Sequence, residues 1–155
     1  MSVSNDKQII ATEFALLRKR VGMTVHETGS FLGVAPNIIK SWNAGRNDAP
    51  RHAIEQMKAL YYQIEDRASA IIEAQEAMID EVGSIPECVE IGIPGSDLEA
   101  QEVAGFPTVS TMLTLAALVS VGRDIPIKLV RRGSTAATSD AINARMLGEA
   151  NKNNE

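Results

Sequence analysis

The chain has 155 residues, of which 45% are apolar, and a formal net charge of −5. This length and this share of apolar residues are enough for a packed core in one domain of ordinary size or in two small ones. One cysteine, Cys88, and two histidines exclude a disulfide framework and a cysteine zinc site within one chain, and we expect no cofactor. The start of the chain is polar and its longest largely apolar run, 109–121, is too short to cross a bilayer, so we expect a cytoplasmic protein without membrane contact.

The charge is unevenly distributed along the chain. Residues 1–60 hold eight Lys and Arg against five Asp and Glu, a net charge of +3, whereas residues 61–106 hold one against eleven, a net charge of −10. This difference in charge between the two segments is expected of a protein that binds phosphates with its N-terminal part. The same difference would also arise if the acidic segment were only a solvated helix face without a function.

A first helix is predicted to begin after a cap at Asp6 or Asn5 and to run to about Arg20. Its apolar residues recur at helical spacing, which predicts a buried stripe made of Ile9, Ile10, Phe14, Leu17 and Val21. The basic run 18–20 in its last turn complements the helix dipole or contacts phosphate.

Residues 24–45 predict two short helices joined by a tight turn. Thr24 and Glu27 have the spacing of a capping box, so a helix begins at Thr24. Gly29 leaves room for a second helix to approach, and Gly33 can adopt the positive φ that a sharp turn requires. Pro36 suits the first position of the next helix, which ends at the glycine of position 45.

The second of these helices, 36–44, has two different faces. Ile39 and Trp42 are expected to face inward at i, i+3 spacing. Asn37, Lys40 and Ser41 project together from the opposite face into solvent, as a mixed set of hydrogen-bond donors and acceptors.

A long helix, 50–82, is predicted to begin at Pro50. Its apolar positions alternate in steps of three and four, at 54, 57, 61, 64, 68, 71, 78 and 82, with Gln75 as the one polar member of the seam. A small domain cannot cover a helix of this length. We therefore expect its distal half to pack on a second copy of the chain or on the C-terminal part.

The C-terminal part predicts a strand, a helix and a second strand. The first strand alternates apolar residues between Pro86 and Pro94, and the second covers 127–132. Between them, 95–107 is predicted to be an acidic loop with at most one helical turn, and a helix from Thr108 to Val121 is apolar on nearly all sides and therefore buried. Such a unit is too small to be stable alone, so dimerisation would complete it.

The predicted fold is therefore mainly α. A helix-turn-helix domain of four to five helices, 1–83, precedes a small α/β (strand-helix-strand) dimerisation domain, 84–132, and a flexible tail, 133–155.

The two-helix segment resembles a known family. Its pattern is similar to the helix-turn-helix of the Cro/C1-type (phage repressor, XRE-like) DNA-binding domains, at Glu27, Gly29, Leu32, Gly33, Val34, Ile39, Trp42 and Gly45. The longer runs LLRKRVGMTVHE and SWNAGRNDAP, followed by a long helix, are more narrowly similar to the anti-CRISPR-associated autorepressors, which carry a small dimerisation domain after the helix-turn-helix. The broad resemblance covers about the first third of the chain.

This resemblance implies a transcription repressor that regulates its own gene. It would act as a homodimer on an inverted-repeat operator in double-stranded DNA, with helix 36–44 in the major groove. The residues that would read bases are Asn37, Lys40 and Ser41. Those that would lie near phosphates are Thr24, Arg46 and Asn47.

The sequence leaves two other classes of function open. In the first, the helix-turn-helix serves as a protein-interaction module with the acidic middle as its working surface, and an antitoxin that represses its own operon combines both roles. In the second, the protein is an enzyme, which the sequence does not favour because its two histidines lie far from any nucleophile pattern and no phosphate-binding glycine loop is present.

Overall fold

The structure is a computed structural model that describes residues 10–132. The predicted caps Asn5 and Asp6, the residue Ile9 and the predicted tail 133–155 lie outside the described residues. The chain divides into two compact units, Met1–Glu65 and Asp66–Glu155. The division falls within the long helix α4 (Arg51–Val82), whereas the sequence-based division placed the whole of this helix in the N-terminal domain.

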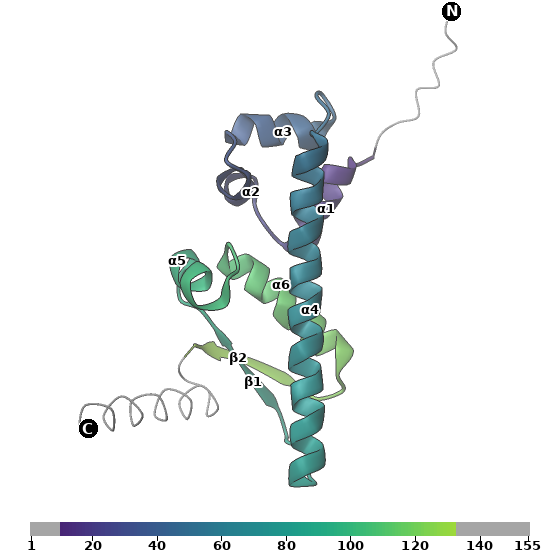
Figure 1. Ribbon diagram of the computed structural model, residues 1–155, viewed down its shortest axis with the longest axis vertical. Coiled ribbons are helices and arrows are strands. Elements are labelled where there is room, and N and C mark those ends of the chain that lie inside the picture. Colours follow the sequence, from purple (N-terminus) through teal and green to yellow (C-terminus); the bar gives the residue numbers. More distant parts are fainter. Residues whose placement is uncertain (1–9, 133–155) are drawn as a thin grey trace, which may run out of the picture. The chain divides into compact units, whose positions relative to one another are not determined.

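The described residues are mainly helical with a small α/β part, as predicted, and the two strands of this part pair in parallel (Figure 1). The N-terminal unit contains α1 (Glu13–Val21), α2 (Val25–Leu32), α3 (Pro36–Ala44) and the first part of α4. Its core is formed by apolar side chains from α1, α3, α4 and the segment between α1 and α2, with at most 8% of each exposed: Phe14, Val21, Met23, Ile39, Trp42, Ile54, Met57, Leu60 and Ile64. The helical character predicted for this part of the chain is thus confirmed.

The first helix begins later than predicted. Thr12 is its N-cap, because the Thr12 hydroxyl accepts a hydrogen bond from the amide of Ala15 at 3.1 Å. The same hydroxyl donates to the carbonyl of Asn43 at 3.3 Å, which fixes this end of the helix against α3. Ile10 therefore precedes the helix and is 96% exposed, so its place in the predicted buried stripe is wrong.

The C-terminal unit contains the second half of α4 and a strand-helix-strand arrangement. Strands β1 (Val89–Ile93) and β2 (Ile127–Arg131) pair in parallel, and α6 (Val109–Gly122) forms part of the connection between them. Ile91 of β1 is buried, whereas Leu129, its partner in the register on β2, is 47% exposed. The first strand is therefore covered better than the second.

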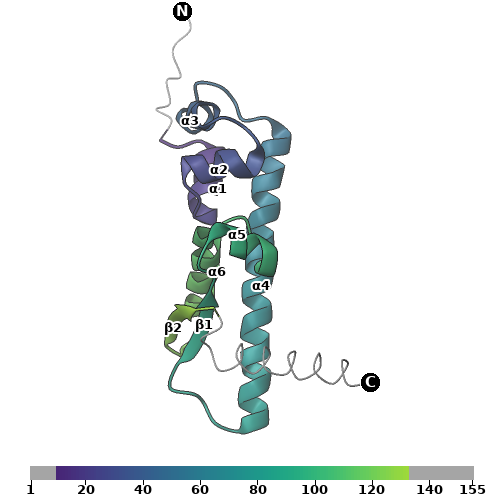
Figure 2. The same ribbon diagram turned by 90° about the vertical axis from the view of Figure 1, so that its left-hand side faces the viewer.

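Helix α6 packs against the second half of α4, and Figure 2 shows the two side by side. A Cβ atom at Gly122 would lie 2.6 Å from Cδ1 of Ile72, and the guanidinium of Arg123 contacts the carboxylate of Glu76 at 2.7 Å. Of the two predicted partners for the distal half of α4, the C-terminal part of the same chain is thus observed. One side of α6 is not covered, however, because Leu113 is 44% exposed.

The predicted acidic loop between the first strand and α6 is instead helical. Helix α5 (Asp97–Glu99) continues directly into the π-helix η1 (Ala100–Ala104). Ser96 caps this segment by accepting a hydrogen bond from the amide of Glu99, and Ala100 is fully buried. The Ser-x-x-Glu spacing of a capping box was present in the sequence, and burial of Ala100 supplies the tertiary contact that a short helix needs.

No single helix within residues 10–132 combines the length and the apolar character needed to span a membrane. Only α5–η1 and α6 taken together reach that length and composition, and they are bent by 63° at the break between them.

Candidate nucleic-acid interface

Helix α3 presents a buried side and a polar side, as the sequence predicts. Ile39 is fully buried and Trp42 is 8% exposed. Asn37 and Lys40 are exposed, and Ser41 is half-buried. The three predicted base-contacting residues therefore share the surface of α3 that points away from the core, at the i, i+3 and i+4 spacing that brings helical side chains together.

The turn between α2 and α3 holds the two helices close together. A Cβ atom at Gly29 would lie only 2.7 Å from the carbonyl oxygen of Val34, so only glycine fits there. The amide of Val34 donates to the carbonyl of Gly29 at 2.9 Å. Gly33 ends α2 at a φ of 72°, a conformation that side chains disfavour, and Pro36 begins α3. These contacts fix the direction in which α3 leaves α2.

Contacts with α1 hold α3 from its other side. The rings of Phe14 and Trp42 meet edge to face, with their centroids 5.3 Å apart. Since Thr12 also donates to the carbonyl of Asn43, two adjacent residues attach the C-terminal end of α3 to the start of α1. The polar face of α3 is thus carried by a helix held on two sides.

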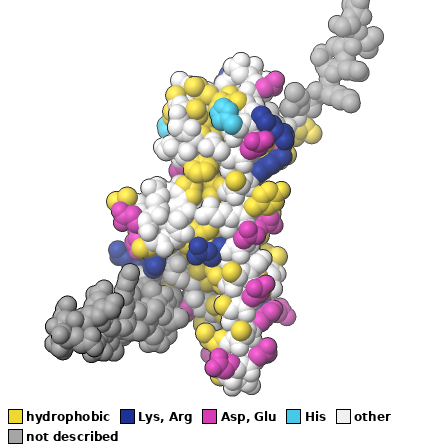
Figure 3. Space-filling model, in the orientation of Figure 1, with side chains coloured by type: hydrophobic (Ala, Val, Ile, Leu, Met, Phe, Trp, Pro, Cys, Tyr) yellow, Lys and Arg dark blue, Asp and Glu magenta, His cyan; other side chains and the backbone are white. Residues whose placement is uncertain are grey.

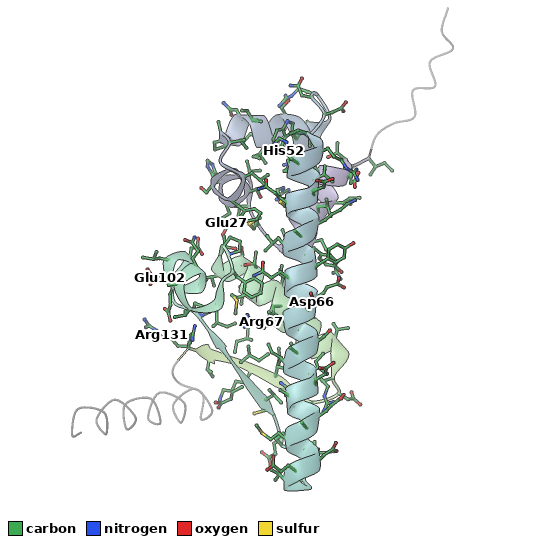
Figure 4. All side chains as sticks on the ribbon, in the orientation of Figure 1. Glu27, His52, Asp66, Arg67, Glu102 and Arg131 are labelled. Atoms are coloured by element: carbon green, nitrogen blue, oxygen red, sulfur yellow. The ribbon has the colours of Figure 1, made fainter. Side chains whose placement is uncertain are left out.

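Thr24 forms the predicted capping box at the start of α2. Its hydroxyl accepts a hydrogen bond from the amide of Glu27 at 3.2 Å, and its own amide donates to the Glu27 carboxylate at 2.8 Å; Figure 4 labels Glu27. Thr24 is exposed. A hydroxyl that accepts one hydrogen bond still carries its own proton, so Thr24 can also donate to a phosphate oxygen at the positive end of the helix dipole.

Arg46 and Asn47 follow Gly45, the residue that ends α3. Arg46 is exposed, and its amide donates to the carbonyl of Ser41 at 3.1 Å, which closes the last turn of the helix. The side-chain amide of Asn47 donates to the hydroxyl of Ser41 at 2.7 Å. One predicted phosphate contact and one predicted base contact are therefore bonded to each other, a relation that the sequence did not indicate.

The three basic residues at the end of α1 differ in their contacts. The guanidinium of Arg18 donates to the carbonyl of Met23 at 2.9 Å, which is a structural contact at the helix end. The guanidinium of Arg20 lies over the ring of Tyr61, 5.4 Å from its centroid, and Lys19 is exposed. On the face shown in Figure 3, one group of Lys and Arg side chains lies over the N-terminal unit, others lie over the C-terminal unit, and Asp and Glu side chains lie along the second half of α4.

Two exposed apolar residues at the start of α3 were not predicted from the sequence as part of the candidate site. Ile38 is 43% exposed, and Ala35, the N-cap residue, is exposed as well. A helical projection that starts from buried Ile39 and Trp42 places Ile38 at the border of the exposed side, so this position could have been found from the spacing alone.

Within the described part of the chain, no three His, Cys, Asp or Glu side chains are gathered as metal ligands. Comparisons of the sequence with models of known protein families and with curated proteins give no match.

Proposed function

We propose that this chain is a sequence-specific transcription repressor that binds double-stranded DNA by placing α3 in the major groove. The observation that carries the proposal is the division of α3 into a buried side, Ile39 and Trp42, and an exposed polar side that includes Asn37 and Lys40. The major groove is about 12 Å wide, which admits an α-helix with its side chains.

The exposed side chains of α3 have the chemistry needed to read base edges. The amide of Asn37 can form two hydrogen bonds with N6 and N7 of adenine. The ammonium of Lys40 suits O6 and N7 of guanine, and the Ser41 hydroxyl can donate to a base or accept from one.

The phosphate contacts would come from both ends of the two-helix segment. Thr24 presents a hydroxyl at the N-terminus of α2, where the helix dipole attracts anions. Arg46 brings a positive charge directly after α3, and Asn47 keeps one amide proton after its bond with Ser41. Contacts of this kind fix the register of α3 on the duplex without specifying bases.

A homodimer would place two copies of α3 in successive major grooves of an inverted-repeat operator. The C-terminal unit exposes large apolar side chains that a second copy could bury: Met78, Val82, Ile85, Val121 and Leu129. A dimer bound upstream of its own gene would exclude RNA polymerase by steric overlap, which is the simplest form of autoregulation.

A second candidate, a protein-interaction or antitoxin-like module, is favoured by one observation on α4. Met78 and Val82 are 59% and 68% exposed, and they lie beside Asp80 and Glu81. An apolar strip with acidic borders suits a partner with basic borders, in place of or in addition to a second copy of this chain.

Selection from a pool of random DNA duplexes, followed by titration at several salt concentrations, tests the proposed function. We expect enrichment of one inverted repeat, with an affinity for it that falls linearly on logarithmic axes as salt rises. A pool without any enriched sequence would exclude a sequence-specific repressor. Absence of salt-dependent binding to any DNA would leave the interaction module as the remaining function.

A further inference from the structure

Helix α3 carries an exposed apolar side chain next to its polar residues. Ile38 is 43% exposed, and it adjoins Asn37 in sequence and Ser41 one turn later. Ala35, the N-cap residue of α3, is also exposed. Together they form an apolar spot at the N-terminal half of α3.

Ile38 is not part of the core side of α3, which is supplied by Ile39 and Trp42. Its exposed part is apolar surface, which is unfavourable in water. A ligand that binds the exposed side of α3 would cover this surface.

The size of the spot favours DNA over a protein as this ligand. Ile38 is the single large hydrophobic residue of α3 that is exposed, and its neighbours Asn37, Lys40 and Ser41 are polar. Protein interfaces are centred on larger contiguous apolar patches. A base edge in the major groove offers one apolar group, the C5-methyl of thymine, which is the size of a single side-chain contact.

We propose that Ile38 is a specificity-determining residue that selects thymine by contact with its C5-methyl group, next to the base pair read by Asn37. This inference rests on the proposed function and refines it. Cytosine lacks the methyl group and presents an N4 amino donor in the groove, so an apolar side chain at this place disfavours it. Each half-site should therefore contain a thymine that no polar residue of α3 accounts for.

The test uses the selected operator with single thymines replaced by uracil, in both half-sites at once. This replacement removes only the methyl group and keeps base pairing. We expect wild-type protein to bind about fourfold more weakly per half-site when the critical thymine is replaced, the loss that corresponds to one apolar methyl contact. Ile38→Ala should bind the thymine operator more weakly and should no longer distinguish it from the uracil operator.

Three further measurements separate this role from a structural one. Ile38→Val, which keeps a branched apolar group, should retain part of the uracil penalty, that is, the loss of affinity when uracil replaces the critical thymine. Leu16→Ala removes a residue of α1 that is 59% exposed and should retain all of it. Ile38→Ala should also keep the wild-type mass by light scattering and the wild-type melting temperature, because the side chain is outside the core.

The outcomes distinguish this inference from the function on which it rests. A selected operator that shows no uracil penalty at any position, or an equal penalty for wild type and Ile38→Ala, overturns the role of Ile38 and leaves the repressor intact. Loss of the wild-type mass in Ile38→Ala assigns the residue to a protein interface and also overturns it. Failure to select any operator removes both proposals.

Discussion

The side-chain amide of Asn47 donates a hydrogen bond to the hydroxyl of Ser41, with 2.7 Å between nitrogen and oxygen. This bond links the turn after α3 to the exposed side of the helix. Since Ser41 is a proposed base contact and Asn47 a proposed phosphate contact, the two roles are physically coupled. A substitution at either residue should therefore change the contribution of the other residue to DNA affinity.

A double-mutant cycle measures this coupling. Ser41→Ala, Asn47→Ala and the double variant should each bind the selected operator more weakly, and the double variant should lose less than the sum of the two single variants. The difference should be on the order of 0.5–1.5 kcal/mol, the usual net value of one hydrogen bond. Losses that add to within about 0.3 kcal/mol would show that the two residues act independently.

The close packing of α2 on α3 at Gly29 can be tested with Gly122 of α6 as a control, because a Cβ atom would be equally crowded at both positions. Gly29→Ala should destabilise the N-terminal unit by about 1–3 kcal/mol, because the new Cβ would lie 2.7 Å from the carbonyl oxygen of Val34, a backbone atom that cannot move freely. Trp42 is the single tryptophan of the chain, so its fluorescence during urea unfolding reports this unit.

Gly122→Ala is the control, because its new Cβ would meet the terminal methyl of Ile72 at 2.6 Å. That methyl can rotate away, and alanine favours the helix, so we expect a change within about 1 kcal/mol by circular dichroism. Equal effects of the two substitutions would contradict the close approach at Gly29.

Trp42→Ala should unfold the N-terminal unit more readily and should not alter base preference. Trp42 is 8% exposed and its ring meets that of Phe14 at 5.3 Å, so truncation leaves a large cavity. The expected cost is about 3–5 kcal/mol, measured by chemical unfolding with circular dichroism at 222 nm. A variant that keeps wild-type stability would place Trp42 outside the core.

Most of the N-terminal unit could be predicted from the sequence because its signals are local. The Thr24–Glu27 capping box, the glycine turn at Gly33 and the initiating Pro36 each depend on residues within a few positions of one another. The start of α1 could not be placed, since Thr12 is preferred as its cap through a bond with Asn43, 31 positions away.

The candidate site, too, could be predicted from the sequence only where its signals are local. Periodicity was sufficient to place Asn37, Lys40 and Ser41 on one side of α3, because a helix repeats every few residues. The bond between Asn47 and Ser41 depends on how the chain turns after the helix, and the helical character of residues 97–104 depends on burial of Ala100. Such tertiary contacts are not encoded in local spacing.

Thr24→Asp separates the structural role of Thr24 from its proposed contact with phosphate. Aspartate is as good an N-cap as threonine, so the melting temperature should stay close to that of wild type. Its negative charge would repel a phosphate placed at the α2 N-terminus, and affinity for all DNA should fall by about tenfold or more at low salt. Thr24→Ser is the matched control and should keep both properties. If Thr24→Asp binds DNA as wild type does, no phosphate lies at this helix end.

The central claim is tested most directly by comparing Asn37→Ala with Arg46→Ala in anisotropy titrations on the selected operator and on a scrambled duplex at two salt concentrations. Both side chains are exposed, so both variants should fold. Asn37→Ala should lose about 1–3 kcal/mol per half-site on the operator and almost nothing on the scrambled duplex. Arg46→Ala should weaken binding to both and reduce the salt slope by about 1 per subunit. Wild-type binding by Asn37→Ala and Lys40→Ala, or equal wild-type affinity for the two duplexes, would contradict the placement of α3 in the major groove.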